Sequence, residues 1–407
     1  MVQVGSLRLS QAPHTSQNLG MKESSRTVQL PESATLGLAA RANEMRARGV
    51  DVLSMAVGEP DFQAPEAARQ AAIRAIGGDV KYTHSGGILS LRNALTKHLQ
   101  RTRGLHYDSS QIVVGHSCKH MLCSSLLALV EPGDEVLLPT PAWNSYDALV
   151  NFAQGKPIHL APKPDLSPDL DLLASSIGPR TRGILFSNPG NPSGYVWGRA
   201  ELEALMEIAK AKDLWIISDE IYSRLVYEGE PFCSAAAISE DAAARTVIVD
   251  GASKSFAMTG YRIGYMAGPS QIAQGITRLQ SQSTGCPNYV SQYAYEEVLL
   301  EEPPEVEAMA NEFNRRRLRL QAGLESLGLD APRPRGAFYS FPNVSAYCDE
   351  RGTAGFCEDL LKAEAMAIVP GTVFGLEGHV RLSYALSMDR IDEAILRLGR
   401  FLKTKKG

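Results

Sequence analysis

Lys254 is the residue whose type and surroundings best suit covalent chemistry. It follows an apolar run that begins at Val247 and stands in the segment Ala-Ser-Lys-Ser. A lysine amine held among small residues at a strand end can form a Schiff base with a carbonyl cofactor and afterwards carry a proton. The alternative is a surface lysine beside a turn. We therefore treat Lys254 as a candidate centre that the rest of the chain must support.

A partly desolvated carboxylate is expected at Asp219, which follows the segment Trp-Ile-Ile-Ser. A buried charge needs a cationic partner, and a protonated pyridine nitrogen would be one. Keeping that nitrogen charged makes the ring an electron sink. Asn191 and Tyr222 are then suited to hydrogen-bond a phenolate oxygen of the ring. A turn asparagine and a packed tyrosine are the alternatives for these two residues.

Other side chains could bind the anionic and aromatic parts of such a ligand. Ser117, Cys118 and Lys119 lie between a predicted strand and a predicted helix, and free backbone N–H groups at a helix start bind phosphate. Arg262 could add a bidentate contact to the same phosphate. Trp143 follows a proline-bounded strand end and offers a face for stacking, with a core tryptophan as its alternative.

Arg381 is a candidate for binding a substrate carboxylate. It lies in the alternating segment Gly-His-Val-Arg-Leu-Ser-Tyr, which predicts a strand. An arginine pointing inward from this strand is costly without an anion. Two parallel hydrogen bonds to a carboxylate would offset that cost, and a structural salt bridge is the alternative.

The elements that must position these residues alternate along the chain. Short apolar runs end in turn residues and are separated by segments with helical spacing, which is typical of a mostly parallel α/β sheet. Ligands of open sheets bind beyond the carboxyl ends of the strands, so the polar run ends are expected to meet in one crevice. The predicted runs are residues 112–114, 135–138, 183–186, 215–217 and the run before Lys254.

The C-terminal part of the sequence differs from this alternation. A long amphipathic helix is predicted from Pro304 to about Leu327, with its arginines at 315–317 and 319 on a solvated face. Beyond Arg335, short strands alternate with helices. This pattern predicts a second, smaller α+β domain.

Composition excludes several classes of function. A formal net charge of -4 gives no reason to expect nucleic acid or an anionic membrane as a partner. No apolar run approaches the ~18 residues of a membrane helix. The six cysteines have neither metal-site spacing nor the pattern of a disulfide framework, so we expect no metal and a cytoplasmic location. A transit peptide at the N-terminus stays open.

Taken together, these residues resemble the class I, fold-type-I aminotransferases that use pyridoxal phosphate, in particular the prokaryotic-type aspartate aminotransferase branch. The similarity covers about residues 29–405. It is carried by segments in a characteristic order and spacing. They are Val57-Gly58-Glu59-Pro60-Asp61-Phe62, Lys81-Tyr82-Thr83, Asn191-Pro192-Ser193-Gly194, Ser218-Asp219-Glu220-Ile221-Tyr222, Ser253-Lys254-Ser255-Phe256 with Gly260-Tyr261-Arg262-Ile263-Gly264, Arg335-Gly336-Ala337-Phe338-Tyr339, and Val369-Pro370-Gly371.

The resemblance implies a role for each candidate. Lys254 would be the Schiff-base lysine and proton shuttle, Asp219 the pyridinium partner, and Tyr222 with Asn191 the phenolate partners. Trp143 would stack on the ring. The phosphate would be held by Ser117, Cys118, Lys119, Ser253 and Arg262. The substrate would be bound by Arg381 on its α-carboxylate, with Gly58, Asn191 and Trp143.

The resemblance also implies the architecture. A mostly parallel seven-stranded sheet would form a large domain that binds the cofactor. With the composition, it predicts a disordered leader at residues 1–28, an arm at 29–62, the large domain at 63–305 and the small domain at 306–407. Members of the family are homodimers with shared sites, in which Tyr82 would reach the neighbouring subunit's phosphate.

The activity implied is ping-pong transfer of an amino group between an L-amino acid and a 2-oxo acid. Aspartate, glutamate or aromatic donors, with 2-oxoglutarate as acceptor, are expected. In aspartate-specific relatives a basic residue near the position of Asn151 contacts the distal carboxylate, and the uncharged Asn151 argues against such a donor. A C–S or other β/γ-lyase or a specialised synthase on the same fold is the alternative, and a non-catalytic protein that binds pyridoxal phosphate is another.

Overall fold

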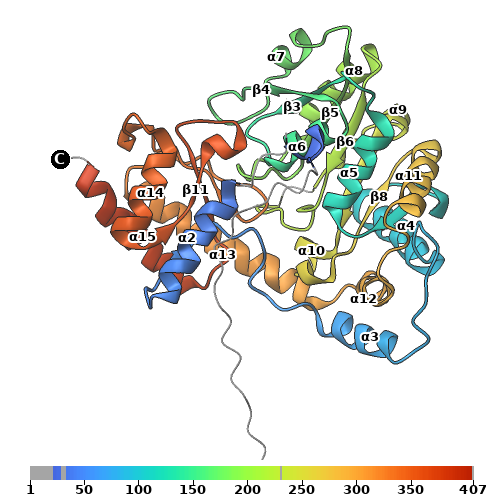
Figure 1. The fold of residues 1–407 in the computed structure, drawn as a ribbon, viewed down its shortest axis with the longest axis horizontal. Coiled ribbons are helices and arrows are strands. Elements are labelled where there is room, and N and C mark those ends of the chain that lie inside the picture. Colours follow the sequence, from blue (N-terminus) through green and yellow to red (C-terminus); the bar gives the residue numbers. More distant parts are fainter. Residues whose placement is uncertain (1–21, 29–33, 230–231, 406–407) are drawn as a thin grey trace, which may run out of the picture. The chain divides into compact units, whose positions relative to one another are not determined.

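The computed structural model describes residues 22–28, 34–229 and 232–405 (Figure 1). Its contacts separate two compact units, Met1–Glu32 and Ser33–Gly407. In the first unit the structure describes a short helix, α1 (Ser25–Val28), inside the predicted leader, and residues 1–21 lie outside the described part. The predicted boundaries after residues 62 and 305 stay predictions. The following paragraphs concern the second unit.

A seven-stranded sheet in the order β2-β8-β7-β6-β5-β3-β4 is the main element of this unit. Strand β8 is antiparallel to its neighbours β2 and β7, and the remaining pairs are parallel. This confirms the predicted mostly parallel α/β sheet. The strands are β2 (Ile112–Gly115), β3 (Glu135–Pro139), β4 (Lys156–Leu160), β5 (Thr181–Ser187), β6 (Trp215–Asp219), β7 (Thr246–Gly251) and β8 (Gly264–Ala267).

Helices cover both faces of the sheet. In β7 every residue is buried; Val247 and Val249 pack in one apolar cluster with α5 and α11, whereas Ile248 packs in another with α4 and α12. Successive side chains of a strand point to opposite faces, so a strand covered on both faces appears as a continuous apolar run. The helices around the sheet are α3 (Glu66–Ile76), α4 (Leu89–Arg103), α5 (Cys118–Leu129), α6 (Ser145–Phe152), α7 (Leu170–Ser175), α8 (Arg199–Ala211), α9 (Glu240–Arg245), α10 (Ala252–Ser255), α11 (Ser270–Gln282) and α12 (Tyr289–Leu300).

The C-terminal part has a smaller, antiparallel sheet in the order β11-β12-β9. A parallel pair, β1 with β10, joins the segment after α2 to this part of the chain. The strands of these two small sheets are β1 (Leu53–Ser54), β9 (Tyr339–Ser340), β10 (Met366–Ala367), β11 (Val369–Pro370) and β12 (Val380–Ser383). The other α-helices of this unit are α2 (Ala34–Ala47), which precedes β1, and α13 (Pro304–Ser326), α14 (Gly352–Glu364) and α15 (Met388–Lys405).

The arginines of α13 do not all lie on a solvated face, so that prediction is wrong for two of them. Arg316 is buried and ion-paired with Asp61 at 2.7 Å. Arg317 is also buried, and it donates to the carbonyl of Pro334 at 2.9 Å and to Glu228 at 2.8 Å. A guanidinium has five donors on a long stem, so it can be buried where partners from other segments accept them.

Neither a membrane helix nor a metal cluster appears in the described residues. None of the described helices combines the length and apolar character needed to cross a membrane. No group of three or more His, Cys, Asp or Glu side chains in these ranges is arranged to hold a metal ion.

Phe313 of α13 joins the long helix to the rest of the core. It is fully buried and contacts the rings of Phe62 and Phe338, each with ring centres 5.2 Å away. We expect Phe313→Ala to lower the free energy of unfolding by about 3 to 5 kcal/mol, because it leaves a cavity. Leu318, 41% exposed on the same helix, is the matched control. Leu318→Ala should change stability by less than about 0.5 kcal/mol in urea unfolding, and equal effects would contradict the packing described.

Candidate active site

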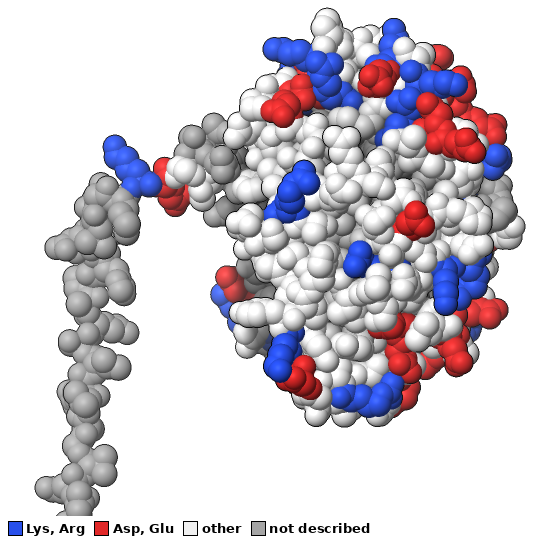
Figure 2. Space-filling view, turned by 90° about the vertical axis from the view of Figure 1, so that its right-hand side faces the viewer, with Lys and Arg blue, Asp and Glu red and all other residues white. Residues whose placement is uncertain are grey.

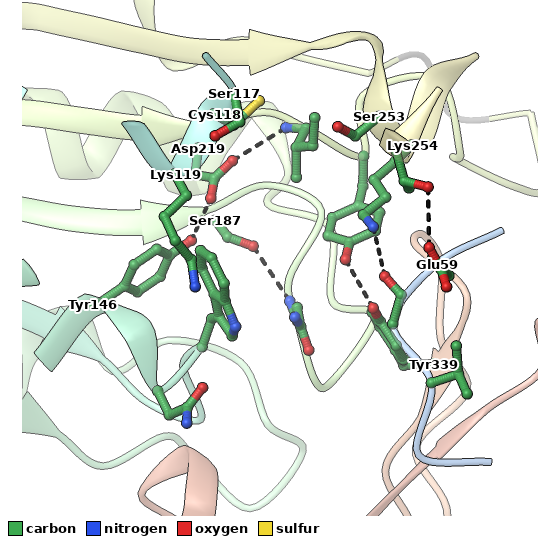
Figure 3. A pocket seen from close by; sticks show the side chains of 18 of the residues that line it. Glu59, Ser117, Cys118, Lys119, Tyr146, Ser187, Asp219, Ser253, Lys254 and Tyr339 are labelled. Carbon is green, nitrogen blue, oxygen red and sulfur yellow. Dashed lines mark hydrogen bonds between the residues drawn. The ribbon is translucent and has the colours of Figure 1, made fainter. Parts of the chain in front are cut away.

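A cavity of about 530 Å³ lies where the strands β5, β6 and β7 end at their carboxyl ends. Ser187 ends β5 and Asp219 ends β6, while Lys254 follows β7 on the short helix α10. These side chains face one another across the cavity (Figure 3). The location is the usual one for ligands of open α/β sheets.

Twelve of the thirteen candidate site residues line this cavity. They are Gly58, Ser117, Cys118, Lys119, Trp143, Asn191, Asp219, Tyr222, Ser253, Lys254, Arg262 and Arg381. The exception is Tyr82, whose side chain is 98% exposed and lies outside the cavity. Asn151 is exposed on α6 and also lies outside it, so it gives no argument about the charge of a substrate bound there.

Lys254 has an amine that can lose its proton near neutral pH. Its Nζ donates a hydrogen bond to the carbonyl of Gly58 at 2.5 Å. Burial lowers the pKa of Lys254 to about 8, although Glu59 and Cys118 oppose the shift. Burial disfavours the charged form of an amine, and a lowered pKa is what a nucleophilic or proton-transferring lysine needs.

Asp219 is a buried carboxylate without a cation beside it. It is 3% exposed and accepts hydrogen bonds from the hydroxyl of Tyr146 at 2.8 Å and the backbone N–H of Ile221 at 3.3 Å. No described Lys, Arg or His forms an ion pair with it. Burial raises the pKa of Asp219 to about 7, despite the two hydrogen bonds, which favour the charged form. A ligand that brings a cation to this carboxylate would therefore be strongly favoured.

The opposite end of the cavity is formed by a cation without a carboxylate. Arg381 on β12 is 5% exposed and donates to Asn191 Oδ1 at 3.1 Å and to the carbonyl of Ala56 at 2.9 Å. Its guanidinium lies 4.5 Å from the ring centre of Tyr339 and 5.0 Å from that of Phe374. Its Nε has no hydrogen-bond partner within the described part of the chain. No described carboxylate pairs with Arg381, so the alternative of a structural salt bridge finds no support.

The start of α5 offers backbone donors to an anion. Ser117 caps this helix and its side chain accepts from the N–H of His120. Among the described residues, the N–H groups of Cys118 and Lys119 have no acceptor. Gly264 holds this turn close to β8, since an added Cβ would lie 2.6 Å from the nitrogen of Cys118. Ser253 and Arg262 line the cavity at the same end.

The Lys119 side chain is another cation of the cavity without a described anionic partner. Its Nζ lies 4.6 Å from the ring centre of Trp143. Burial, and then the charge of Arg262, lower the pKa of Lys119. Its side chain is therefore available for an anion other than the one at the helix start.

Two tyrosines of the cavity were not assigned a role from the sequence. Tyr146 on α6 reaches Asp219 across 73 residues of sequence. Tyr339 on β9 shares a hydrogen bond of 2.9 Å with the hydroxyl of Tyr222. The sequence carries no periodic signal for Tyr146, because its contact depends on how α6 packs against the end of β6. Tyr339 lies within a family segment, which was the only signal available for it.

These residues fit pyridoxal phosphate. Asp219 lacks a cation that a protonated pyridine nitrogen would supply, and the start of α5 has free N–H groups for a phosphate. Lys254, with its lowered pKa, lines the same cavity as these two features. The cavity thus has one group for each functional part of the cofactor: Asp219 for the ring nitrogen, the start of α5 for the phosphate, and Lys254 for the carbonyl carbon.

The buried Asp219 makes the stability of the ligand-free protein depend on pH. Between its usual pKa near 3.8 and about 7, the folded chain holds a proton that the unfolded chain has released, so stability falls as pH rises through this window. Asp219→Asn should remove this fall and be more stable than the wild type by about 4 kcal/mol at pH 8, with no difference near pH 4. Urea unfolding at both pH values measures it. Asp213→Asn, at an exposed position, is the control, and a gain at Asp219 that is independent of pH would contradict the account.

Comparisons with known proteins agree with the geometry. Residues 50–398 match the model of the family described as aminotransferase class I and II. The chain is 38% identical to aspartate aminotransferase of Bacillus sp. (strain YM-2), over 94% of this chain and 100% of the relative. It is 39% identical to the aspartate/prephenate aminotransferase of Thermus thermophilus, covering 94% and 99%. The structure of a Thermus thermophilus aspartate aminotransferase with maleate superimposes with a TM-score of 0.90 at 38% identity, over 94% of this chain and 100% of that one.

The fold, the cavity and these similarities lead to one conclusion. The chain is an enzyme that transfers amino groups with the help of pyridoxal phosphate, on the architecture of fold type I. It belongs to the family of class I and II aminotransferases.

Proposed function

We propose that this aminotransferase prefers acidic amino acids, exchanging an amino group between L-aspartate or L-glutamate and a 2-oxo acid such as 2-oxoglutarate. Four cations line the cavity without described carboxylate partners, and Lys254 and Arg262 are assigned to the cofactor. The observation that carries the proposal is that Arg381 and Lys119 then remain for the substrate. A dicarboxylic substrate has one carboxylate for each. Relatives at 38% identity are named aspartate aminotransferases, which supports the same choice.

Different residues of the cavity would bind different parts of the cofactor. When bound, pyridoxal phosphate supplies a carbonyl carbon that takes up the amino group and a ring that withdraws electrons. Asp219 would keep the ring nitrogen protonated, Tyr222 and Asn191 would hydrogen-bond the ring oxygen, and Trp143 would stack on the ring. The phosphate would be held by Ser117, Ser253, Arg262 and the backbone N–H groups of Cys118 and Lys119, all of which line the cavity.

Lys254 carries the proton transfer. Its Nζ accepts the proton that leaves the substrate α-carbon. Later in the same half-reaction it donates this proton to the carbon that takes up the amino group. A pKa of about 8 leaves a substantial fraction of the amine neutral near pH 7 to 8, which suits a group that both accepts and donates. The hydrogen bond to the carbonyl of Gly58 orients the amine toward the cavity.

Replacing Lys254 tests this role. Lys254→Ala should lower kcat by at least about 10² to 10⁴, because positioned proton transfer is worth this much. Cofactor content, read from the absorbance of the purified protein, separates lost chemistry from lost binding. Lys163, an exposed lysine, provides the control in Lys163→Ala. A Lys254→Ala enzyme with most of its activity would overturn the assignment.

We assign one cation of the cavity to each carboxylate of the substrate. Arg381, oriented by Asn191 and the carbonyl of Ala56, takes the α-carboxylate in a bidentate contact. Its position between two aromatic rings keeps water from the guanidinium and strengthens the interaction. The ammonium of Lys119 takes the distal carboxylate, while its backbone N–H serves the phosphate.

The donor preference should depend on Lys119. Lys119→Met should lower kcat/KM for L-aspartate by roughly 10- to 100-fold, the value of a charge-assisted hydrogen bond. It should affect L-phenylalanine much less, because this donor has no distal carboxylate. Lys119→Arg should keep the preference for aspartate. An equal loss for both donors would place Lys119 on the cofactor alone.

We further propose that the enzyme is a homodimer. Figure 2 shows a broad face with few charged residues, on the side where α3, α4, α11 and α12 lie in Figure 1. Exposed apolar side chains on these helices include Ile73 and Ile76 of α3, Leu89 of α4 and Leu300 of α12. Tyr82 is exposed in the segment between α3 and α4, where it could complete the cavity of a second copy.

A charge on this face should separate the subunits. Ile76 is 68% exposed, and Ile76→Glu should shift the protein from dimer to monomer in sedimentation equilibrium, since burying an unpaired carboxylate is costly. Leu396 is 64% exposed on α15, away from this face, so Leu396→Glu is the matched control. Dimers of unchanged stability in Ile76→Glu would exclude this face as the interface.

A cytoplasmic location completes the proposal. All six cysteines are free thiols, although several are only partly buried. Free cysteines in a chain of this size fit a reducing compartment.

A further inference from the structure

A group of buried charges lies beside the active site and has no part in the proposed mechanism. Arg103, at the end of α4, forms ion pairs with Asp250 of β7 and with Glu220, which follows β6, the latter at 3.3 Å. The exposed fractions of the three side chains are 1%, 4% and 0%. Ionised groups are almost never buried this completely unless they are paired.

The three side chains are extensively hydrogen-bonded. Arg103 also donates to Ser223 at 2.8 Å and to the hydroxyl of Tyr265 at 3.2 Å. Asp250 accepts from the N–H of Gly251 at 2.6 Å. Glu220 accepts from the hydroxyls of Ser218 at 3.0 Å and Ser234 at 2.6 Å. Such a network costs desolvation energy and is a weak source of stability, so its position suggests another use.

The network lies next to the two reactive groups. Glu220 directly follows Asp219, and Asp250 precedes Lys254 by four residues on the strand paired with β6. Three carboxylates are thus buried together, and Arg103 pairs with two of them. After burial itself, the charges of Asp250 and Glu220 are what raise the pKa of Asp219.

We propose that Arg103 is a positioning residue that compensates Glu220 and Asp250, so that Asp219 is the one buried carboxylate free to pair with the ring nitrogen of the cofactor. Arg103 contacts neither the cavity of the active site nor Asp219, and it acts through the two carboxylates it holds. The inference rests on the proposed role of Asp219. It adds that Arg103, at the C-terminal end of α4, keeps Asp219 able to ionise when the cofactor binds.

The neutral titratable groups around this network do not compensate the charges of Glu220 and Asp250, so Arg103 supplies the compensating positive charge. Asp219 also faces Tyr146, Tyr222 and Cys118, whose pKa values burial raises well above their ordinary range, so they stay neutral near pH 7. Around Arg103, burial keeps Tyr107, Tyr265 and His98 neutral. Arg224 pairs with Glu302 at the edge of the network.

The test is the dissociation constant of pyridoxal phosphate, measured against pH by equilibrium dialysis with apoprotein, which needs no activity. Affinity should fall on the acid side as Asp219 takes a proton before the cofactor binds. In Asp250→Asn, which removes a neighbouring negative charge, the acid midpoint should move down by about one pH unit, a tenfold change at fixed pH below it. In Arg103→Met the midpoint should move up by a similar amount.

Further variants separate charge from structure. Arg103→Lys keeps the charge and should keep the midpoint, whatever happens to thermal stability. Arg103→Met with Asp250→Asn removes one charge of each sign and should return the midpoint toward that of the wild type. Arg101→Met is the matched control, because Arg101 lies two residues away on the same helix with a side chain 45% exposed. A merely structural role would change stability in these variants and leave the midpoint in place.

The variants distinguish failure of the inference about Arg103 from failure of the proposed role of Asp219. If Asp219→Asn binds the cofactor with wild-type affinity and the same acid midpoint, the proposed role of Asp219 is wrong. If Asp219→Asn loses affinity but Asp250→Asn keeps the wild-type midpoint, only the inference about Arg103 is overturned. A wild-type midpoint in Asp250→Asn overturns the inference even if Arg103→Met does not fold, and in that case Arg103→Lys still tests the role of the Arg103 charge.

Discussion

The active site depends on two buried charges of opposite sign that have no described charged partner. Asp219 is buried at the end of β6 with two hydrogen bonds and no described cation, so its carboxylate is costly to ionise until a ligand supplies the missing charge. At the other side of the cavity, the guanidinium of Arg381 is buried without a carboxylate partner among the described residues. The pocket is therefore complementary to a cofactor with a protonated ring nitrogen and a substrate with a carboxylate. For Asp219, burial raises the pKa, so ionising this carboxylate in the ligand-free protein is unfavourable.

The parallel sheet is what brings these groups together. Ser187 and Asp219 end the strands β5 and β6, and the segment that carries Lys254 follows β7 beside them; parallel strands end at the same edge. Arg381 comes from the smaller sheet and reaches the cavity beside Asn191, which follows β5. The site thus joins two sheets, and a change in their relative position would move the substrate against the cofactor.

The sequence predicted those parts of the site that follow from local patterns. Buried parallel strands are continuous apolar runs, so β5, β6 and β7 and the polar residues after them could be located before the structure was known. Tyr146 and Arg103 could not, because their contacts with Asp219 and Asp250 join residues 73 and 147 positions apart. The prediction that Arg316 and Arg317 face solvent failed for the same reason, since their partners lie on distant segments. The argument drawn from Asn151 failed because the side chain lies outside the cavity, whereas Lys119 lines it.

The central claim is that the chemistry is amino transfer and that it stops after one half-reaction when no acceptor is present. The most direct measurement mixes the cofactor-loaded enzyme with L-aspartate alone and follows the 2-oxo acid released. The account predicts one equivalent of oxaloacetate per bound cofactor, then no further release until 2-oxoglutarate is added, when L-glutamate should form. Continuous formation of a 2-oxo acid and free ammonia without any acceptor would contradict it and indicate elimination.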